Sequence, residues 1–158
     1  MRKFEKISKK QFKKDIPEGN YNDIVLPYRK TMNSAGYDFI SLCRMCIKPN
    51  ESVRIPTGIK VMLNNDEFLA LYIRSSLGIK YGIRLSNQVG IVDADFYNNP
   101  DNEGHIWICV KNEGENEFVI EKGTAFAQGV FTKYYITEDD AATGVRTGGI
   151  GSTDRRLL

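Results

Sequence analysis

The fold is decided by residues 52–73, which read SVRIPTGIKVMLNNDEFLALYI. Ile, Val and Leu occupy every second position over 59–63, and an apolar run follows at 68–73. Alternation with a period of two places successive side chains on opposite faces of a strand. The Asn-Asn-Asp between the two segments, at 64–66, is typical of a turn. The stretch therefore predicts strands separated by a tight turn.

The same pattern extends outward along the chain. Ile106, Ile108 and Val110 alternate with Trp107 and Cys109, which predicts a further strand. Clusters of turn-forming residues recur at intervals too short for long helices, and they lie at Pro49–Asn50, Asn64–Asp66, Asn98–Asn102, Asn112–Gly114 and Lys122–Gly123. We expect an all-β fold, a sandwich or jelly roll with little helix.

Two short segments favour a helix. Ser8 and Gln11 have the spacing of a capping box, which predicts a helical turn over Ser8–Lys14. Thr137–Ala142 is the other segment with a brief helical pattern.

Length and composition limit the protein class. The 158 residues suffice for one domain of ordinary size. With 41% hydrophobic and 27% charged residues, a mean hydropathy of −0.38 and no apolar run of bilayer length, the chain is neither a membrane protein, a coiled coil nor a disordered polymer. We divide it into a basic extension (1–20), a jelly-roll domain (21–143) and a glycine-rich segment (144–158) that we expect to be a mobile lid.

The charges and cysteines argue against several partners. Residues 1–14 carry seven basic side chains and one acidic one, but no nucleic-acid motif or aromatic platform follows them. We interpret this head as a solvated face and expect no nucleic-acid partner. Cys43 and Cys46 form a lone CxxC without two further ligands, so we expect no zinc site. An odd number of cysteines and no recognisable leader predict a cytoplasmic location.

Three segments have the composition of a phosphate-handling site, although no Walker A or GxGxxG pattern is present. Residues 74–78 (RSSLG) offer a guanidinium, two hydroxyls and a glycine amide, which we read as a phosphate clamp outside any helix. Residues 146–153 repeat this chemistry in a glycine-rich setting. Between them, Asp93 and Asp95 would share one face of a strand, where a carboxylate beside an apolar wall can act as a general base on water. Each segment alone is also common in ordinary loops.

Taken in order, five segments resemble the motifs of the trimeric deoxyuridine triphosphatase (dUTPase) family. They are residues 33–38 (NSAGYD), 74–78 (RSSLG), 90–96 (GIVDADF), 123–128 (GTAFAQ) and 148–153 (GGIGST). The resemblance runs from about residue 24 to residue 153, and five motifs in order are far more specific than any one of them.

The resemblance implies a distorted jelly roll in which three identical subunits share three active sites. It implies hydrolysis of dUTP to dUMP and pyrophosphate, with Mg²⁺ on the phosphates. The dUMP would serve dUMP biosynthesis in nucleotide metabolism. Asp93 would be the base that activates water, and Asp38 would lie near the hydration shell of the magnesium ion. The implied substrate contacts are with the phosphates (Arg74, Ser75, Ser76, Gly78 and Gln128), the uracil edge (Asn87 and the hairpin backbone at Gly90 and Val92), the deoxyribose (Phe96) and the lid (Arg146, Ile150, Gly151, Ser152 and Thr153).

The chain departs from the family pattern at several positions. Ala125 and Ile150 replace a usual Arg and a usual uracil-stacking Phe, and Phe96 replaces a usual Tyr. Arg146 stands one residue closer to the Gly-Gly pair than the family's Arg does. The hairpin after Phe96 is longer than usual, with residues 98–102 as the excess.

Two other functions remain open. A dCTP deaminase, or a bifunctional deaminase and dUTPase, shares the Arg-Ser-Ser-Leu segment, but no stretch after Asn112 resembles the motif that would supply its glutamate. A nucleotide-gated binding protein with weak catalysis would account for the altered lid and the lysine-rich head.

Overall fold

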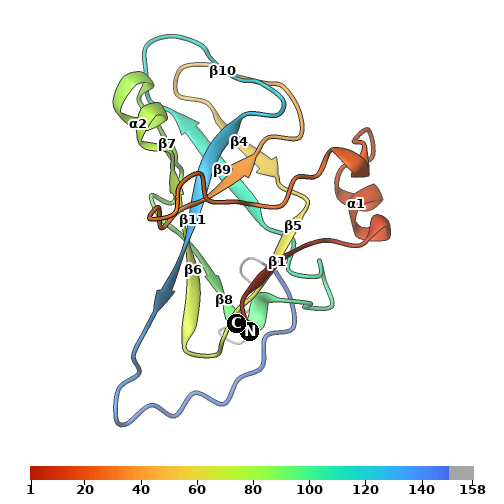
Figure 1. The fold of residues 1–158 in the computed structure, drawn as a ribbon, viewed down its shortest axis with the longest axis vertical. Coiled ribbons are helices and arrows are strands. Elements are labelled where there is room, and N and C mark those ends of the chain that lie inside the picture. Colours follow the sequence, from red (N-terminus) through yellow and green to blue (C-terminus); the bar gives the residue numbers. More distant parts are fainter. Residues whose placement is uncertain (150–158) are drawn as a thin grey trace, which may run out of the picture.

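The computed structural model describes residues 1–149, and they form a β-structure with two short α-helices (Figure 1). The helices are α1 (Lys9–Asp15) and α2 (Ser75–Tyr81), with 3₁₀ turns η1 (Tyr21–Asp23) and η2 (Ala94–Phe96). The strands are β1 (Lys3–Lys6), β2 (Tyr37–Ile40), β3 (Met45–Ile47), β4 (Ser52–Pro56), β5 (Ile59–Met62), β6 (Glu67–Ile73), β7 (Ile83–Leu85), β8 (Gly90–Asp93), β9 (Trp107–Asn112), β10 (Phe118–Ile120) and β11 (Ala125–Lys133).

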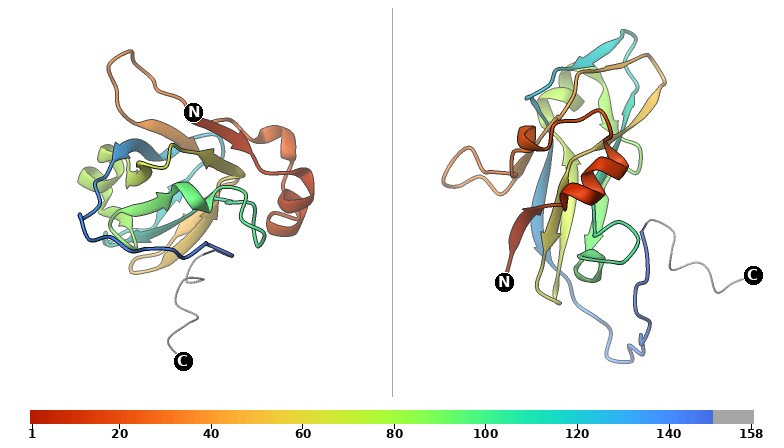
Figure 2. Two further views of the ribbon diagram at one scale, coloured as in Figure 1. Left: turned by 90° about the horizontal axis from the view of Figure 1, so that it is seen from below. Right: turned by 90° about the vertical axis from the view of Figure 1, so that its right-hand side faces the viewer.

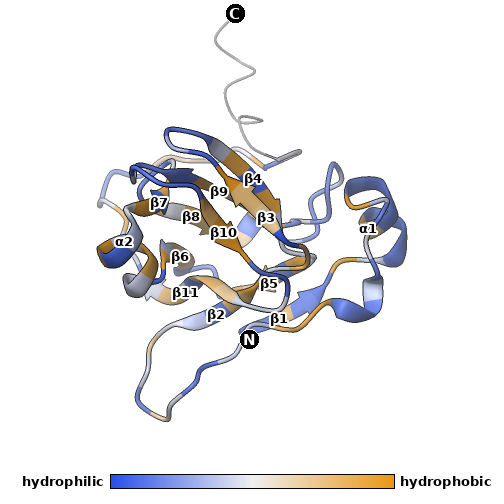
Figure 3. Ribbon diagram, turned by 90° about the horizontal axis from the view of Figure 1, so that it is seen from above, coloured by the Kyte–Doolittle hydropathy of each residue, from blue (hydrophilic) through white to orange (hydrophobic). Residues whose placement is uncertain are grey.

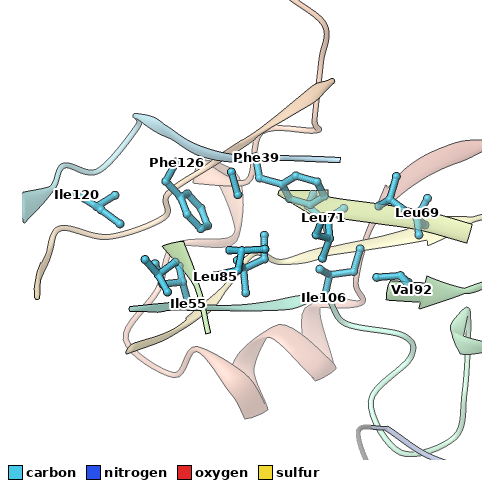
Figure 4. Packing of buried hydrophobic residues seen from close by; sticks show 14 of the residues in the cluster. Phe39, Ile55, Leu69, Leu71, Leu85, Val92, Ile106, Ile120 and Phe126 are labelled. Atoms are coloured by element: carbon cyan, nitrogen blue, oxygen red, sulfur yellow. The ribbon is translucent and has the colours of Figure 1, made fainter. Parts of the chain in front are cut away.

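The strands are arranged in antiparallel sheets. A four-stranded sheet has the order β2-β11-β6-β8 and a three-stranded sheet the order β4-β9-β7, while β1-β5 and β10-β3 form pairs. Apolar side chains from the two larger sheets meet in one core, where Phe39, Leu69 and Phe126 lie opposite Ile55 and Leu85 (Figure 4). The all-β sandwich expected from the sequence is confirmed.

Alternation along the strands determines which side chains enter this core. On β9, Ile108 and Val110 are buried, whereas Trp107 and Cys109 are only partly covered. The strand predicted from these residues is therefore confirmed, and Figure 3 shows the apolar strands grouped together, with the mostly polar helix α1 at one side of them.

The first 20 residues, predicted as a basic extension, also contribute to the core. Strand β1 pairs with β5, and Ile7 and Phe12 are almost fully buried. Helix α1 begins where the sequence predicts, because the Ser8 side chain accepts a hydrogen bond from the Gln11 N–H. The lysines of α1 are exposed.

Three local predictions are wrong. Residues 137–142 are not helical, because a short helix needs tertiary packing and these side chains are all exposed. Residues 75–78 belong to α2, with Arg74 as its N-cap residue and Gly82 ending it in a left-handed conformation (φ 66°). Asp95 lies in η2 after the strand that carries Asp93, so the two carboxylates do not share a strand face.

After β11 the chain leaves the sheet as an arm of residues 134–149. Figure 1 shows this arm, in blue, passing below β6 and β8 and rising on the side of the loop of residues 97–105. None of the helices within residues 1–149 combines the length and apolar character needed to span a bilayer.

Candidate functional site

A pocket of about 260 Å³ lies beside β8. Six residues predicted from the sequence line it: Asn87, Gly90, Val92, Asp93, Phe96 and Arg146. The remaining wall is mostly apolar and consists of Leu71, Ile91, Ile106, Trp107 and the buried His105. A second pocket, of about 430 Å³, shares Asp93 and Arg146 with the first and also contains Asp95. Asp93 thus stands between an apolar hollow and a polar one.

The position of Asp93 follows from the alternation of β8. Gly90 and Val92 face the core, whereas Ile91 and Asp93 face outward. Gly90 pairs with Leu71 of β6, and a Cβ added at Gly90 would lie 3.0 Å from the Leu71 Cβ. The glycine therefore allows β8 to lie close to β6.

Arg146 binds both carboxylates of this acidic site. Its Nη2 lies 2.7 Å from Asp93 Oδ2 and its Nε lies 2.8 Å from Asp95 Oδ1. The guanidinium carbon also lies 5.8 Å from the centre of the Phe96 ring. A guanidinium presents several N–H donors in one plane and can therefore bind two carboxylates at once, although it carries only one positive charge. In this chain the arm therefore offsets one of the two negative charges of the acidic pair.

The residues predicted to contact phosphate form a separate, cationic site. Arg74 Nε and Lys30 Nζ each lie 3.5 Å from a carboxylate oxygen of Asp38, which is 7% exposed. Gln128 on β11 pairs with Asp38 on β2, and Ser75 is exposed at the start of α2. Two cations around one buried carboxylate leave a net positive charge that favours an anion.

Lys30 was not predicted from the sequence. It reaches Asp38 because the Asp38 N–H donates to the Tyr28 carbonyl and an isolated bridge joins these two residues. The intervening loop is thereby folded back over β2. A contact of this kind, between a loop and a strand, leaves no periodic signal in the sequence.

The acidic site and the cationic site lie at opposite ends of β6. Asp93 is aligned with Phe68 at the beginning of this strand, and Arg74 follows Ile73 at its end. At about 3.3 Å per residue, these positions are about 20 Å apart along the strand. One chain therefore does not bring the predicted base and the predicted phosphate clamp together.

The lid residues fall into two groups. Gly148 and Gly149 are buried, and the Gly149 N–H points to Asp101 Oδ2 at 3.4 Å. Ile150, Gly151, Ser152 and Thr153 lie outside the described residues. Asp101 was not predicted as a contact of the arm, although it belongs to the segment recognised as excess length.

The available donors suit a metal ion that arrives with phosphates. Within residues 1–149, no three His, Cys, Asp or Glu side chains gather into a metal-binding group. Asp38, Asp93 and Asp95 supply hard carboxylate oxygens, which are the ligands Mg²⁺ prefers when substrate phosphates and water complete its shell. Cys43 and Cys46 are exposed free thiols; Cys46 lies on β3 and Cys43 lies before this strand.

Comparisons with known proteins agree with this arrangement. The dUTPase family model matches residues 22–154. The deoxyuridine 5'-triphosphate nucleotidohydrolase of Lactococcus lactis subsp. lactis is 44% identical over 132 residues, which cover 82% of this chain and 88% of that protein. The enzyme of the same name from Desulfitobacterium hafniense is 35% identical over 136 residues, covering 81% and 86%.

Solved structures have the same fold. The dUTPase from Streptococcus mutans superposes with a TM-score of 0.71 at 37% identity, covering 85% of this chain and 98% of that one. The dUTPase of phage phi11 of S. aureus has a TM-score of 0.68 and covers 93% and 99%, but at 17% identity it supports the fold alone. The match of the family model over most of the chain, together with these relatives, shows that the chain belongs to the dUTPase family.

Proposed function

We propose that this protein is a homotrimeric enzyme that hydrolyses dUTP to dUMP and pyrophosphate in sites shared between subunits. The relatives named deoxyuridine 5'-triphosphate nucleotidohydrolase support the reaction. The proposal of a site shared between subunits rests on one observation: the acidic and cationic sites of one chain lie at opposite ends of β6. Each site lacks what the other holds, and a second copy can supply it.

The acidic site provides the base and the nucleoside pocket. Asp93 accepts a proton from the attacking water and orients its lone pair toward the phosphorus atom. Asn87 and the backbone at Gly90 and Val92 bind the uracil edge. The Phe96 ring lies against the sugar, where its apolar face offers no hydrogen bond to a 2′-hydroxyl, and burying an unpaired hydroxyl is costly.

The cationic site holds the triphosphate. Arg74, with its planar fork, and Gln128 bind phosphate oxygens, while Ser75, Ser76 and Gly78 add hydroxyls and an amide. Phosphoanhydride hydrolysis needs a positioned water and neutralised phosphates but little covalent participation by the protein. This requirement matches a site that uses no histidine.

Asp38 would hold a phosphate-bound Mg²⁺ through the water shell of the ion. Such an ion neutralises charge that develops on the phosphate oxygens. Asp38 is prepared for this role because Arg74 and Lys30 keep its carboxylate oriented.

Arg146 and residues 150–153 close the site as a lid. Arg146 binds Asp93 and Asp95 in the chain described above, so the base becomes free when this guanidinium turns to the phosphates. The free thiols at Cys43, Cys46 and Cys109 suit a reducing, cytoplasmic location, which is part of the proposal.

A mixing experiment tests the reaction and the shared site together. Asp93→Asn and Arg74→Ala should each abolish pyrophosphate release from dUTP with Mg²⁺, while Asp93→Asn keeps nucleotide affinity. When the two variants are unfolded together and refolded at equal amounts, about a quarter of the sites should combine an intact Asp93 with an intact Arg74 from another chain. Activity should therefore recover to about that fraction.

The controls separate the alternatives. Each variant refolded alone must stay inactive, and no recovery in the mixture would contradict a site shared between chains. Uracil nucleotides appearing from dCTP would favour a deaminase. Nucleotide binding without any pyrophosphate release by the unaltered protein would favour a nucleotide-gated binding protein.

A further inference from the structure

The N-terminal segment of residues 3–15 holds the loop of residues 97–105 at four points. These contacts join Glu5 to Tyr97, Ser8 to Glu103, Lys14 to the Asp101 carbonyl and Asp15 to His105. Figure 2 shows α1, in red, beside this loop, in green. The loop contains the excess residues 98–102 that separate this chain from the family pattern, so the two unusual parts of the sequence support each other.

His105 is the most deeply buried of these anchors. Its side chain is 0% exposed, its Nδ1 lies 2.6 Å from Asp15 Oδ2, and its Nε2 lies 2.9 Å from the Gly58 nitrogen. Because the Gly58 N–H is a donor, Nε2 must be the acceptor and Nδ1 must carry the proton. The Asp15 carboxylate thereby fixes the tautomer and orientation of a ring that lines the nucleoside pocket.

Glu103 forms the second anchor. Its carboxylate accepts hydrogen bonds from the Ser8 N–H at 2.9 Å and the Ser8 hydroxyl at 2.6 Å. Lys60 of β5 lies 3.7 Å from the same carboxylate and 2.6 Å from Asn98 Oδ1. The start of α1 and the middle of the loop are therefore connected through charge-assisted hydrogen bonds.

The loop transmits this support to Phe96. The Asn99 Nδ2 donates to the Phe96 carbonyl at 2.8 Å. Gly104 has a φ of +79°, and a Cβ there would lie 2.6 Å from the same carbonyl oxygen. The backbone of Phe96 is consequently enclosed by the loop, and its ring faces the pocket that also contains His105 and Trp107.

We propose that residues 3–15 are a positioning element of the active site, which act through His105 and Glu103 to hold Phe96 against the sugar and so determine the preference for deoxyribonucleotides. The proposal rests on the proposed function, since it assigns Phe96 to the sugar. Asp15 and Ser8 are positioning residues that do not touch the substrate. When these side chains are removed, we expect the loop of residues 97–105 to become more mobile and the Phe96 ring to move away from the sugar. The pocket can then accommodate a 2′-hydroxyl.

Nucleotide selectivity tests this proposal. The affinities of the non-hydrolysable imido analogues of dUTP and UTP are measured from the fluorescence of Trp107, the only tryptophan, whose ring centre lies 5.2 Å from that of His105. Asp15→Ala should reduce the ratio of the two affinities tenfold or more, chiefly by tighter binding of the UTP analogue. Asp15→Asn, whose amide oxygen still accepts from Nδ1, should retain most of the ratio. The ratio of kcat/KM for dUTP and UTP should fall in parallel.

Asp23→Ala is the matched control. Asp23 lies shortly after α1 in the sequence, and its carboxylate pairs with Lys122 at 2.7 Å. Its removal therefore breaks an ion pair but none of the contacts with the loop of residues 97–105. This variant should keep the selectivity of the unaltered protein. If Asp15→Ala does not fold, Ser8→Ala provides the same test through Glu103.

The outcomes distinguish this proposal from the proposed function. Variants that unfold at lower temperature but keep the full selectivity overturn the positioning role and leave dUTP hydrolysis intact. An unaltered protein that releases no pyrophosphate, but whose binding selectivity falls in Asp15→Ala, refutes the reaction and supports the positioning role. An unaltered protein that binds neither analogue overturns both.

Discussion

The buried His105 ring has a perturbed pKa and makes contacts that the sequence does not indicate. Burial lowers its pKa from the ordinary value of 6.5, although the Asp15 carboxylate and, more weakly, Glu103 act in the opposite direction. It is the only histidine of the chain. Its role as an anchor depends on α1, and no spacing in the sequence relates residue 15 to residue 105.

The lowered pKa of His105 makes stability depend on pH. The unfolded chain takes up a proton near pH 6.5, whereas the folded protein resists protonation, so the unfolded state binds more protons in this interval. The thermal midpoint should therefore fall as pH decreases below about 6.5. Differential scanning calorimetry between about pH 7.5 and pH 5.5 measures this, and His105→Gln should remove the decline in this window.

Two carboxylates make stability depend on pH in a separate, more acidic range. Hydrogen bonds from Arg2 lower the pKa of Glu67, and those from Lys3 and Tyr97 lower the pKa of Glu5, from an ordinary value of 4.5. Their stabilisation is present above that value and is lost as pH falls below it. A decline in His105→Gln as steep as in the unaltered protein above pH 5 would contradict the assignment to His105.

Gly104 offers a second prediction for a single residue. Gly104→Ala combines a left-handed φ with a close approach to the Phe96 carbonyl, whereas Gly123→Ala has a similar φ of +80° and no atom within 4 Å of the added Cβ. Urea unfolding should show a loss of about 1 kcal/mol for Gly123→Ala. Gly104→Ala should cost about 2–4 kcal/mol, since steric displacement adds to the strain. Equal losses would show that the Phe96 backbone can move away.

At the scale of elements, the sequence predicts structure where local signals agree with packing. The capping box at Ser8 predicted α1, and the alternation over 59–63 predicted β5. Residues 75–81 were not recognised as a helix because two serines and Gly78 are weak helix formers. That helix depends on the left-handed Gly82 and on Leu77, which packs against the core.

Ser8→Ala tests the cap of α1. This change removes the acceptor of the Gln11 N–H and one donor to Glu103. We expect a loss of about 1–3 kcal/mol in the free energy of unfolding, since a cap and a charge-assisted hydrogen bond disappear together. Ser52→Ala, at the exposed start of β4, should change it by less than about 0.5 kcal/mol in the same urea titration. Similar values for both variants would contradict the importance of the cap.

At the scale of the whole molecule, the order of the five motifs predicted the family, and the resemblance implied sites shared between three subunits, but the periodicity of the sequence did not show which motifs meet within one chain. The sequence placed Asp93 and Arg74 in one site, and the register of β6 with β8 separates them within a chain. Which motifs come together is a property of sheet topology and of the number of copies. Neither can be obtained from the periodicity of one sequence.

Removal of residues 144–158 is predicted to reduce turnover far more than stability. Of the described residues that are removed, 144, 145 and 147 are exposed, and the two buried ones, Gly148 and Gly149, have no side chain to pack, so they contribute little to the core. The thermal midpoint should change by no more than about 3 °C, while dUTP turnover should fall about tenfold or more. Arg146→Ala in the full chain shows how much of this loss belongs to the guanidinium. A large drop of the midpoint in the truncated protein would contradict the prediction.

The position of β8 as the outermost strand of its sheet has a further consequence. Free strand borders expose unpaired amides and carbonyls that can recruit strands from other molecules. Here Ile91 is exposed on that border, and Asp93 and Asp95 follow it with two negative charges. Asp93 and Asp95, which we propose for the active site, leave one net negative charge beside this strand edge when Arg146 is bound, and charge at an edge disfavours the addition of strands from other molecules.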